Sequence, residues 1–253
     1  MLKKGIQDEI LLITIDRAKA LNAINAAVMD GLKEIFVDTE EWKDYRGIII
    51  TGAGEKAFAA GADIKEFPNY GEKEGAELSR KGHEVYDAIE NCTVPVLAVI
   101  NGFSLGGGNE LAMACHMRIA EAHAKFGQPE INLGLIPGYA GTQRLVRYLG
   151  KAKAIELLLT GDMIHAEEAH SLGLVNAIAP SGEGMEAAMK LMGKIASKSK
   201  TVVAHMLKTV HAYHSYEPSF DIESQTFGAC FELDDMKEGV AAFMEKRKPN
   251  FKN

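Results

Sequence analysis

The chain of 253 residues lacks long apolar runs, and its first residues carry no export signal. No apolar stretch approaches the roughly 18 residues that a membrane-spanning helix needs. The start, MLKKGIQDEILLITID, lacks the apolar stretch followed by small residues that is typical of a signal peptide. We therefore expect a cytoplasmic protein with no membrane partner.

Basic residues are too few for an extended phosphate-binding surface. The 28 Lys and Arg residues stand against 35 Asp and Glu residues, which makes the formal net charge −7. Proteins that bind the nucleic-acid backbone need a broad basic surface, so this balance argues against a nucleic-acid partner. A small anionic ligand is compatible with the same charge, because a few lysines placed near one another suffice to attract it.

Cysteine is also scarce. Cys92, Cys115 and Cys230 are odd in number and far apart, which fits neither a disulfide framework nor a zinc-binding pair. No HxxxH or CxxC pair occurs in the sequence. We therefore expect no metal site, and we interpret the cysteines as reduced core residues.

Apolar runs bounded by glycine alternate with helical periodicity in the first half of the chain. The runs at residues 10–15, 48–51 and 94–100 predict strands. Their continuous apolar character favours strands buried on both faces, and therefore an α/β core with parallel sheets. After about Gly138 the pattern predicts one late strand at residues 172–179 and helices over residues 139–150, 151–161, 184–197 and 202–246.

Two Gly-rich loops, at residues 52–67 and 101–115, each connect an apolar strand to a helix. At the start of a helix the backbone N–H groups have no partner within the helix, and they can bind an anion. Two such loops side by side would form an oxyanion hole.

The second loop also contains GFSLG (Gly102 to Gly106), which matches the GxSxG motif of serine hydrolases. One alternative is therefore a hydrolase with Ser104 as the nucleophile. A match at three fixed positions is common by chance, and Ser104 is more simply a small residue in a tight turn.

Two glutamates follow the second loop. Glu110 lies in the predicted helix among apolar neighbours, and Glu130 lies on a predicted loop directly after Pro129. Taken singly, each is a cap or a surface charge more often than a catalytic group. Two carboxylates near an oxyanion hole can instead divide the roles of acid and base.

Three long runs, at residues 49–66, 95–115 and 124–145, resemble the crotonase, or enoyl-CoA hydratase/isomerase, superfamily, and enoyl-CoA hydratase most closely. Shorter runs at residues 19–25, 159–176 and 235–251 fit the same family in the same order. The resemblance implies an α/β fold with a crotonase-like spiral of ββα units over residues 1–195. It also implies a helical C-terminal region over residues 196–253 that forms a homo-trimer or hexamer.

The resemblance further implies the chemistry. The oxyanion-hole amides fall on Ala62 and Gly107, and Glu110 and Glu130 fall on the two catalytic glutamates that hydrate a trans-2-enoyl-CoA. Neither a metal nor a separate cofactor is implied, because CoA is part of the substrate. A 3-enoyl-CoA isomerase, and a non-catalytic or RNA-binding relative, remain as alternatives.

The family's substrate-binding positions fall on Lys19, Ala20, Leu21, Ala62, Asp63, Ile64, Lys65, Gly107, Gly138, Phe243 and Lys246. Lysines among them can attract the CoA phosphates locally while the whole chain stays acidic. The chain departs from the common family pattern at Ala18, Asn109, His116 and Tyr139. Asn109 and Tyr139 lie close to the predicted site in sequence, so the length of the acyl chain is left open.

Overall fold

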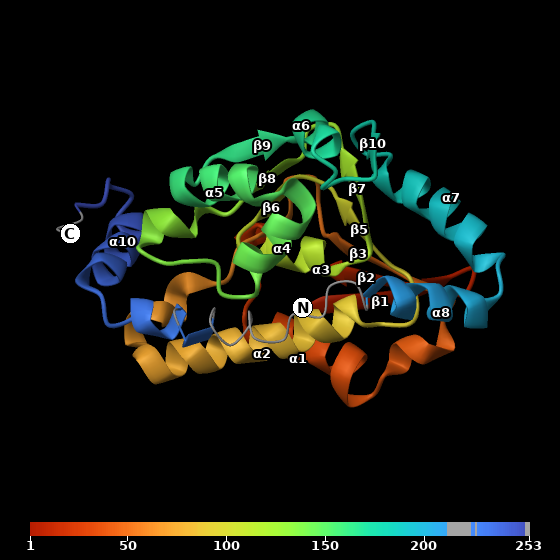
Figure 1. Cartoon of the computed structure of the whole chain (residues 1–253), viewed down its shortest axis with the longest axis horizontal. Coiled ribbons are helices and arrows are strands. Elements are labelled where there is room, and N and C mark those ends of the chain that lie inside the picture. Colours follow the sequence, from red (N-terminus) through yellow and green to blue (C-terminus); the bar gives the residue numbers. More distant parts are fainter. Residues whose placement is uncertain (212–223, 226, 251–253) are drawn as a thin grey trace.

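The computed structural model describes residues 1–211, 224–225 and 227–250, and its strands form two sheets (Figure 1). The six-stranded sheet has the order β1-β2-β3-β5-β7-β10, and the four-stranded sheet has the order β4-β6-β8-β9. The strands of the first sheet are β1 (Leu2–Gln7), β2 (Ile10–Ile15), β3 (Gly47–Gly52), β5 (Val96–Ile100), β7 (Met117–Glu121) and β10 (Ala177–Ala179). Those of the second sheet are β4 (Ala57–Ala60), β6 (Phe103–Leu105), β8 (Lys125–Gly127) and β9 (Met163–His165).

Most neighbouring strands run parallel, as the apolar runs predict. Only β1 with β2 and β8 with β9 pair antiparallel within the two sheets. In β3, Ile48, Ile49 and Ile50 are all 0% exposed. Successive side chains of a strand point to opposite faces, so both faces of this sheet are covered.

The chain winds as a spiral in which each turn adds one strand to each sheet and then a helix. The three turns are β3, β4 and α2 (Glu72–Glu90); β5, β6 and α3 (Gly107–Ala114); and β7, β8 and α4 (Gly141–Leu149). This arrangement confirms the predicted spiral of ββα units.

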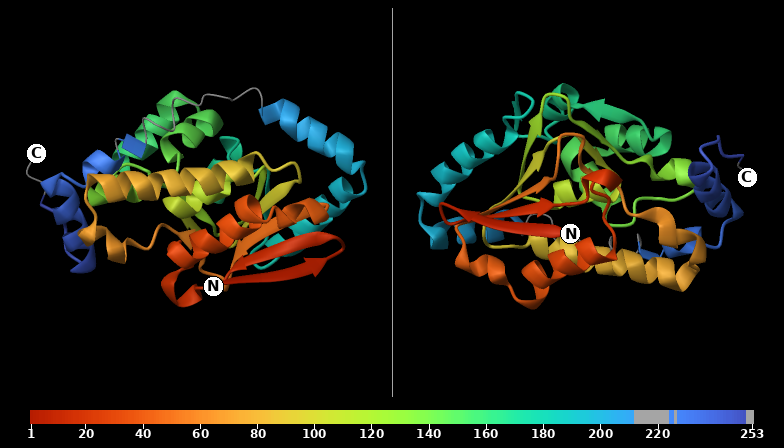
Figure 2. Two further views of the ribbon diagram at one scale, coloured as in Figure 1. Left: turned by 90° about the horizontal axis from the view of Figure 1, so that it is seen from below. Right: turned by 180° about the vertical axis from the view of Figure 1, so that it is seen from behind.

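Further helices cover the sheets and extend to both ends of the molecule (Figure 2). They are α1 (Ala26–Lys33), α5 (Lys151–Thr160), α6 (Ala166–Ser171), α7 (Gly184–Ala196), α8 (Lys200–His211) and α10 (Asp234–Met244). Shorter turns are η1 (Ala18–Ala20), η2 (Glu34–Asp38), η3 (Glu41–Asp44), η4 (Ile64–Asn69) and η5 (Pro129–Leu133). Helices α7 and α8 lie at the opposite end of the molecule from α10 (Figure 1).

The prediction of a single late strand at residues 172–179 is wrong in the length of that strand and in the number of late strands. Only Ala177–Ala179 of residues 172–179 form a strand, β10, while Leu174 and Val175 are buried outside it. The side chains of Leu174 and Val175 are apolar because they pack in the core. A second late strand, β9, was not predicted, because three residues are too few to show a period. Helical structure is predicted over residues 202–246, where α10 and most of α8 lie, although α8 already begins at Lys200. Residues 212–223 and 226 of this range, like residue 251 of the last matched run, lie outside the described residues.

All three cysteines are buried, as predicted. Burial raises the pKa of Cys92 and of Cys115 to about 12, so neither is a thiolate at neutral pH. In the part of the chain that the structure describes, every helix is too short or too polar to cross a membrane.

His116, two residues after the end of α3, connects several elements. Its Nδ1 accepts a hydrogen bond from the backbone N–H of Val96 at 3.0 Å. Its Nε2 lies 3.0 Å from the carbonyl oxygen of Glu90 and 3.3 Å from Nε2 of His211. Because a carbonyl oxygen only accepts, Nε2 carries the proton and the ring is neutral. Burial lowers the pKa of His116 to about 4, although the hydrogen bond to the Glu90 carbonyl acts in the opposite direction.

This neutral ring is expected to make folding sensitive to mild acid. The unfolded chain protonates His116 near pH 6.5, whereas the folded chain resists protonation down to about pH 4. Stability is therefore lost as the pH falls from 6.5 toward 4, and this residue accounts for about 2 kcal/mol between pH 7 and pH 5. Urea unfolding at pH 7 and pH 5 measures this loss of stability. The loss should be about 2 kcal/mol smaller in His116→Asn, because the variant has no imidazole to protonate. The Asn side chain keeps an acceptor for the Val96 N–H. Equal losses in the two proteins would contradict the prediction.

Candidate active site

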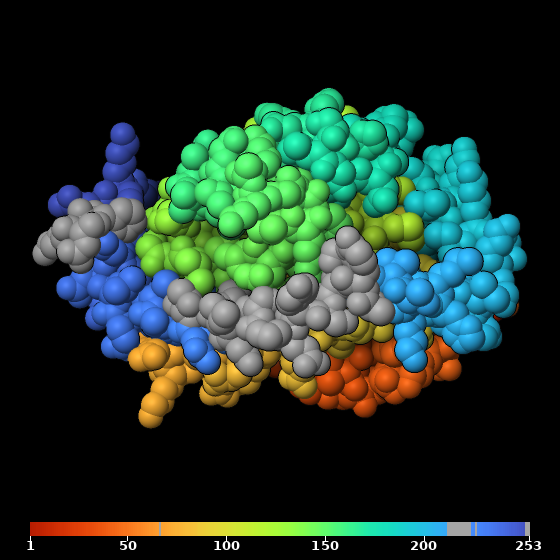
Figure 3. All heavy atoms as spheres, viewed as in Figure 1, coloured from red at the N-terminus to blue at the C-terminus, as the bar shows by residue number. Residues whose placement is uncertain are grey.

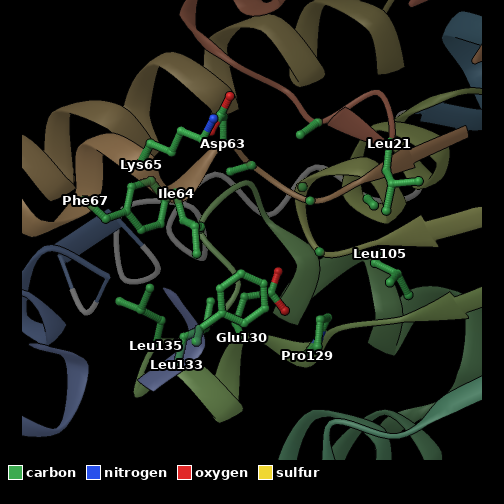
Figure 4. Close-up of a pocket in the computed structure, with 18 of the residues that line it drawn as sticks. Leu21, Asp63, Ile64, Lys65, Phe67, Leu105, Pro129, Glu130, Leu133 and Leu135 are labelled. Atoms are coloured by element: carbon green, nitrogen blue, oxygen red, sulfur yellow. The ribbon is translucent and has the colours of Figure 1, made fainter. Parts of the chain in front are cut away.

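A cavity of about 570 Å³ lies where the two Gly-rich loops meet η5 and α10. In the close-up, the Glu130 carboxylate points into the cavity, Leu133 and Leu135 lie on one side, and Leu105 lies on the other (Figure 4). A cavity of this size and mainly apolar lining is typical of a small-molecule site.

The cavity brings together every predicted site residue except Lys246. The predicted residues that line it are Lys19, Ala20, Leu21, Ala62, Asp63, Ile64, Lys65, Gly107, Glu110, Glu130, Gly138 and Phe243. Lys246 follows α10, is exposed and does not reach this cavity. The predicted proximity of segments far apart in sequence is thus present in the fold.

An ion pair and a buried asparagine hold the first two of these segments together. Arg17 donates to Oδ2 of Asp63 at 2.8 Å, and the pair is mostly buried. Asn22 is 1% exposed and donates to the carbonyls of Ala53 and Ala57 at 3.0 and 2.7 Å. These contacts fix η1 beside the end of β4, and both Lys19 and Lys65 line the cavity.

Two backbone N–H groups meet at the cavity. Ala62 pairs with Ile24 in a parallel bridge that uses the Gly61 carbonyl and the Asp63 N–H, so the Ala62 N–H points away from Ile24. Gly107 begins α3, where its N–H has no partner within the helix. A Cβ atom on Gly107 would lie 3.4 Å from the Ala62 nitrogen. Within the described residues, neither N–H donates to a backbone carbonyl.

The second loop needs glycine at two positions. A Cβ atom on Gly108 would lie 2.0 Å from the carbonyl oxygen of Ala59, so α3 packs directly on β4. Gly106 has φ +48°, and a Cβ atom there would lie 2.5 Å from Oε1 of Glu130. The first approach packs α3 on β4, and the second places the N-terminus of α3 beside Glu130.

Glu110 lies in the first turn of α3 and is 1% exposed. Its Oε1 accepts hydrogen bonds from the backbone N–H groups of Tyr139 and Gly141, both at 2.7 Å. Gly141 begins α4, so the carboxylate lies at the positive end of a helix. An ionised carboxylate only accepts hydrogen bonds, and two N–H donors on one oxygen suit that form.

The turn that presents these N–H groups is itself anchored. Ala140 has φ +70°, and the carbonyl of Tyr139 accepts a hydrogen bond from Nη1 of Arg144 at 2.9 Å. Arg144 is fully buried and lies 2.7 Å from a carboxylate oxygen of Glu90, on α2. Burial acts to raise the pKa of Glu90, but the charge and hydrogen bonds of Arg144 and the charge of Arg147 hold that pKa below its ordinary value.

Glu130 reaches the cavity from a different element, η5, which is a short 3₁₀ helix and not the predicted loop. Pro129 occupies the first position of that helix, where its fixed φ is well suited. The side-chain amide of Gln128, with its nitrogen turned toward Glu130, donates to the two carboxylate oxygens at 3.2 and 3.3 Å. Gln128 itself is 1% exposed, so its amide is held away from solvent.

The outer wall of the cavity belongs to a separate apolar cluster. Phe227 and Phe231 pack there with Phe67 and Leu135 of the spiral. Helix α10 contacts η4 and η5, and Figure 3 shows the dark blue residues of α10 at the end of the molecule away from α8. Phe243 of α10 lines the cavity directly, so the C-terminal region closes a site that the spiral builds.

The hydrolase alternative finds no support. Ser104 is 0% exposed in β6 and does not line the cavity. Its hydroxyl has no hydrogen-bond partner in the described part of the chain, so no base is in contact with it. Among the same residues, no three His, Cys, Asp or Glu side chains are grouped so that they could hold a metal ion.

Sequence reasoning missed the groups that surround the two glutamates. Gln128 and Arg144 are polar residues that are almost fully buried, and burial of such residues signals a specific partner. The sequence shows the residue types but not their burial. The N–H groups of the turn after Gly138 belong to the backbone, so no residue type in the sequence indicates their role.

A spiral of ββα units whose loops bring two backbone N–H groups to one apolar cavity agrees with the crotonase superfamily, which the sequence resembles. The model of the enoyl-CoA hydratase/isomerase family matches residues 5–253. The chain therefore belongs to the enoyl-CoA hydratase/isomerase family.

Individual relatives agree with this assignment. A probable enoyl-CoA hydratase of Bacillus subtilis is 45% identical over 98% of this chain and 97% of its own. A crotonyl-CoA hydratase of Syntrophomonas wolfei is 42% identical over 97% of this chain and 95% of its own. The crystal structure of an enoyl-CoA hydratase from Bacillus anthracis, 34% identical, covers 99% of this chain and 98% of its own with a TM-score of 0.80.

Proposed function

We propose that the protein catalyses the reversible syn hydration of a short trans-2-enoyl-CoA thioester to a 3-hydroxyacyl-CoA. One observation carries the proposal: Glu110 and Glu130, from different elements, line the cavity at which the Ala62 and Gly107 N–H groups meet. Relatives named as enoyl-CoA and crotonyl-CoA hydratases support the same chemistry.

The two N–H groups would receive the thioester carbonyl oxygen. Attack at Cβ moves electrons onto this oxygen, and fixed donors stabilise the resulting enolate more than the substrate. A single donor of this kind is worth about 3 to 4 kcal/mol in the transition state. The Gly107 N–H adds the positive end of α3 to this effect.

The two carboxylates would handle the water. Glu110, as the carboxylate, takes a proton from a water whose oxygen bonds to Cβ. Glu130, as the acid, delivers a proton to Cα, and the roles reverse in dehydration. Both groups act on the same face of the double bond, which gives syn addition. No metal or redox cofactor is needed, because N–H donors polarise the carbonyl and carboxylates move both protons.

Several residues would bind the rest of the substrate. Lys19 and Lys65 are exposed at the cavity rim, where their charges suit the CoA phosphates. The bulky ring of Tyr139 is buried and lines the cavity. It packs edge-on against the ring of Tyr86, with 5.5 Å between the ring centroids. Together with Phe227 this ring limits the space for an acyl chain, which favours short substrates.

The C-terminal region would also support assembly. Val202, Met206 and Val210 of α8 are 49%, 63% and 65% exposed, an apolar face that another subunit would cover. In the homo-trimer or hexamer that we propose, Lys246, which does not reach the cavity of its own chain, would contact the CoA of a neighbouring subunit.

The purified protein is expected to remove the ultraviolet absorbance of crotonyl-CoA, because hydration breaks the conjugation between the double bond and the thioester. The product should gain the mass of one water, and kcat/KM should fall for longer enoyl chains. A product of unchanged mass from a 3-enoyl-CoA, without hydration of crotonyl-CoA, would identify an isomerase and contradict the proposal.

A further inference from the structure

The peptide group between Gly138 and Tyr139 is held at both of its ends. Its carbonyl oxygen accepts a hydrogen bond from Oγ of Ser79 at 2.5 Å, and its N–H donates to Oε1 of Glu110 at 2.7 Å. A trans peptide is planar, so its C=O and N–H point in opposite directions. Any rotation that moves the carbonyl away from Ser79 also turns the N–H away from Glu110.

We propose that Ser79 is a positioning residue for Glu110 and acts through this single peptide group. The inference rests on the proposed function, because it assumes that Glu110 is the base. Ser79 lies on α2, is not among the residues that line the cavity, and donates its hydrogen bond to the Gly138 carbonyl, so its effect on the reaction is indirect.

The packing of α2 leaves Ser79 little freedom. Ser79 is 0% exposed and lies between Gly75 and Gly82, which let the helix approach closely. A Cβ atom on Gly82 would lie 2.0 Å from the ring of Tyr139, and one on Gly75 would lie 2.4 Å from the ring of Phe231. Because neighbours on both sides are in contact with the helix, the hydroxyl stays near the carbonyl of the turn.

A chain of buried polar groups orients the Ser79 hydroxyl. Oγ of Ser79 lies 3.3 Å from Oγ of Ser224, which lies 3.1 Å from Nδ1 of His83. The Gly138 carbonyl only accepts, so it takes the single proton of Ser79. Ser224 must then donate to Ser79, and Nδ1 of His83 must donate to Ser224. Hydrogen bonds in such a chain strengthen one another.

Burial isolates this chain from solvent. Ser79, Ser224 and His83 are 0%, 2% and 7% exposed, so water does not readily replace a missing hydroxyl. The chain also joins three parts of the molecule, because His83 lies on α2, Ser224 lies in the C-terminal region, and Gly138 borders the cavity.

Ser79→Ala tests the proposal, and Ser104→Ala is the matched control. Both serines are 0% exposed, but the Ser104 hydroxyl has no hydrogen-bond partner in the described residues. We expect Ser79→Ala to lower kcat about tenfold with KM nearly unchanged, since a misplaced base slows the reaction but not binding. Ser104→Ala should keep kcat within about twofold. Equal kcat values in the two variants would overturn the proposal.

A double variant separates positioning from a general loss of structure. If Ser79 acts through Glu110, Ser79→Ala should change kcat by less than about twofold in a Glu110→Gln background. An undiminished tenfold effect there would overturn the proposal. Ser224→Ala, which keeps the Ser79 hydroxyl, should lower kcat about threefold. If Ser79→Ala does not fold, Ser224→Ala alone tests the proposal. An unchanged kcat in Ser224→Ala would then overturn it.

These outcomes are distinct from a failure of the proposed function. If Glu110→Gln keeps full activity, Glu110 is not the base, and the function fails whatever Ser79→Ala does. If Glu110→Gln is inactive while Ser79→Ala matches Ser104→Ala, the function stands and only the role of Ser79 is lost.

Discussion

Glu110→Gln is expected to lower kcat for the hydration of crotonyl-CoA by about 10²- to 10⁴-fold, with KM changed little. Gln keeps the shape of Glu110 and an oxygen that can accept from the N–H groups of Tyr139 and Gly141. It cannot take a proton from water. The fold should therefore survive while the base is lost, and steady-state kinetics with an unfolding curve measure both.

Glu121→Gln is the control for this experiment. Glu121 is 6% exposed and accepts hydrogen bonds from the N–H groups of Gly182 and Gly184 at 2.8 and 3.3 Å. It thus matches Glu110 in burial and in kind of partner, but it does not line the cavity. A Glu110→Gln enzyme as active as Glu121→Gln would rule out a two-glutamate mechanism. Glu130→Gln should show a loss comparable to that of Glu110→Gln, because the acid is equally needed.

Arg144→Ala is expected to lower the free energy of unfolding by about 3 to 5 kcal/mol. Arg144 is fully buried, and its Nε and Nη2 donate to Oε2 of Glu90 at 2.9 and 2.7 Å. Its removal leaves the Glu90 carboxylate, which is only 18% exposed, without its closest positive charge. The loss is measured by urea unfolding at neutral pH, where Glu90 is ionised.

Arg147→Ala is a matched control, because Arg147 lies on the same helix and donates to the other oxygen of Glu90 at 3.1 Å. Its side chain is 19% exposed, and its loss should cost about 1 kcal/mol or less. The double variant Glu90→Gln, Arg144→Met should recover part of the stability, because no buried charge is left unpaired. If Arg144→Ala costs no more than Arg147→Ala, the buried pair does not have the stabilising role assigned to it.

The spiral core is predictable from the sequence because its signals are local. Runs such as PVLAVI are apolar at every position, and this property follows directly from burial on both faces of a parallel sheet. The Gly-rich loops are equally readable, because Gly106 and Gly108 are required by close backbone contacts. The resemblance to a known family then places Glu110, Glu130, Ala62 and Gly107, and the fold brings all four to one cavity.

The supporting contacts are not predictable, because they join residues far apart in sequence. Ser79 lies 59 residues from Gly138, and Arg144 lies 54 residues from Glu90. No helical or strand period encodes such pairs. The three-residue strand β9 escapes detection for a different reason, since its pairing with β8 and not its own sequence makes it a strand.

The cavity wall has a consequence for protein synthesis. The two glutamates and the two N–H groups all lie between residues 62 and 130, whereas Phe227, Phe243 and Met244 close the cavity from the C-terminal region. The ribosome therefore synthesises the polar groups of the site before the C-terminal part of its apolar wall. In the proposed reaction, a site open to water on this side would stabilise the enolate less than the closed cavity. Full activity of the proposed hydratase would therefore need α10, the last helix of the described residues, in place.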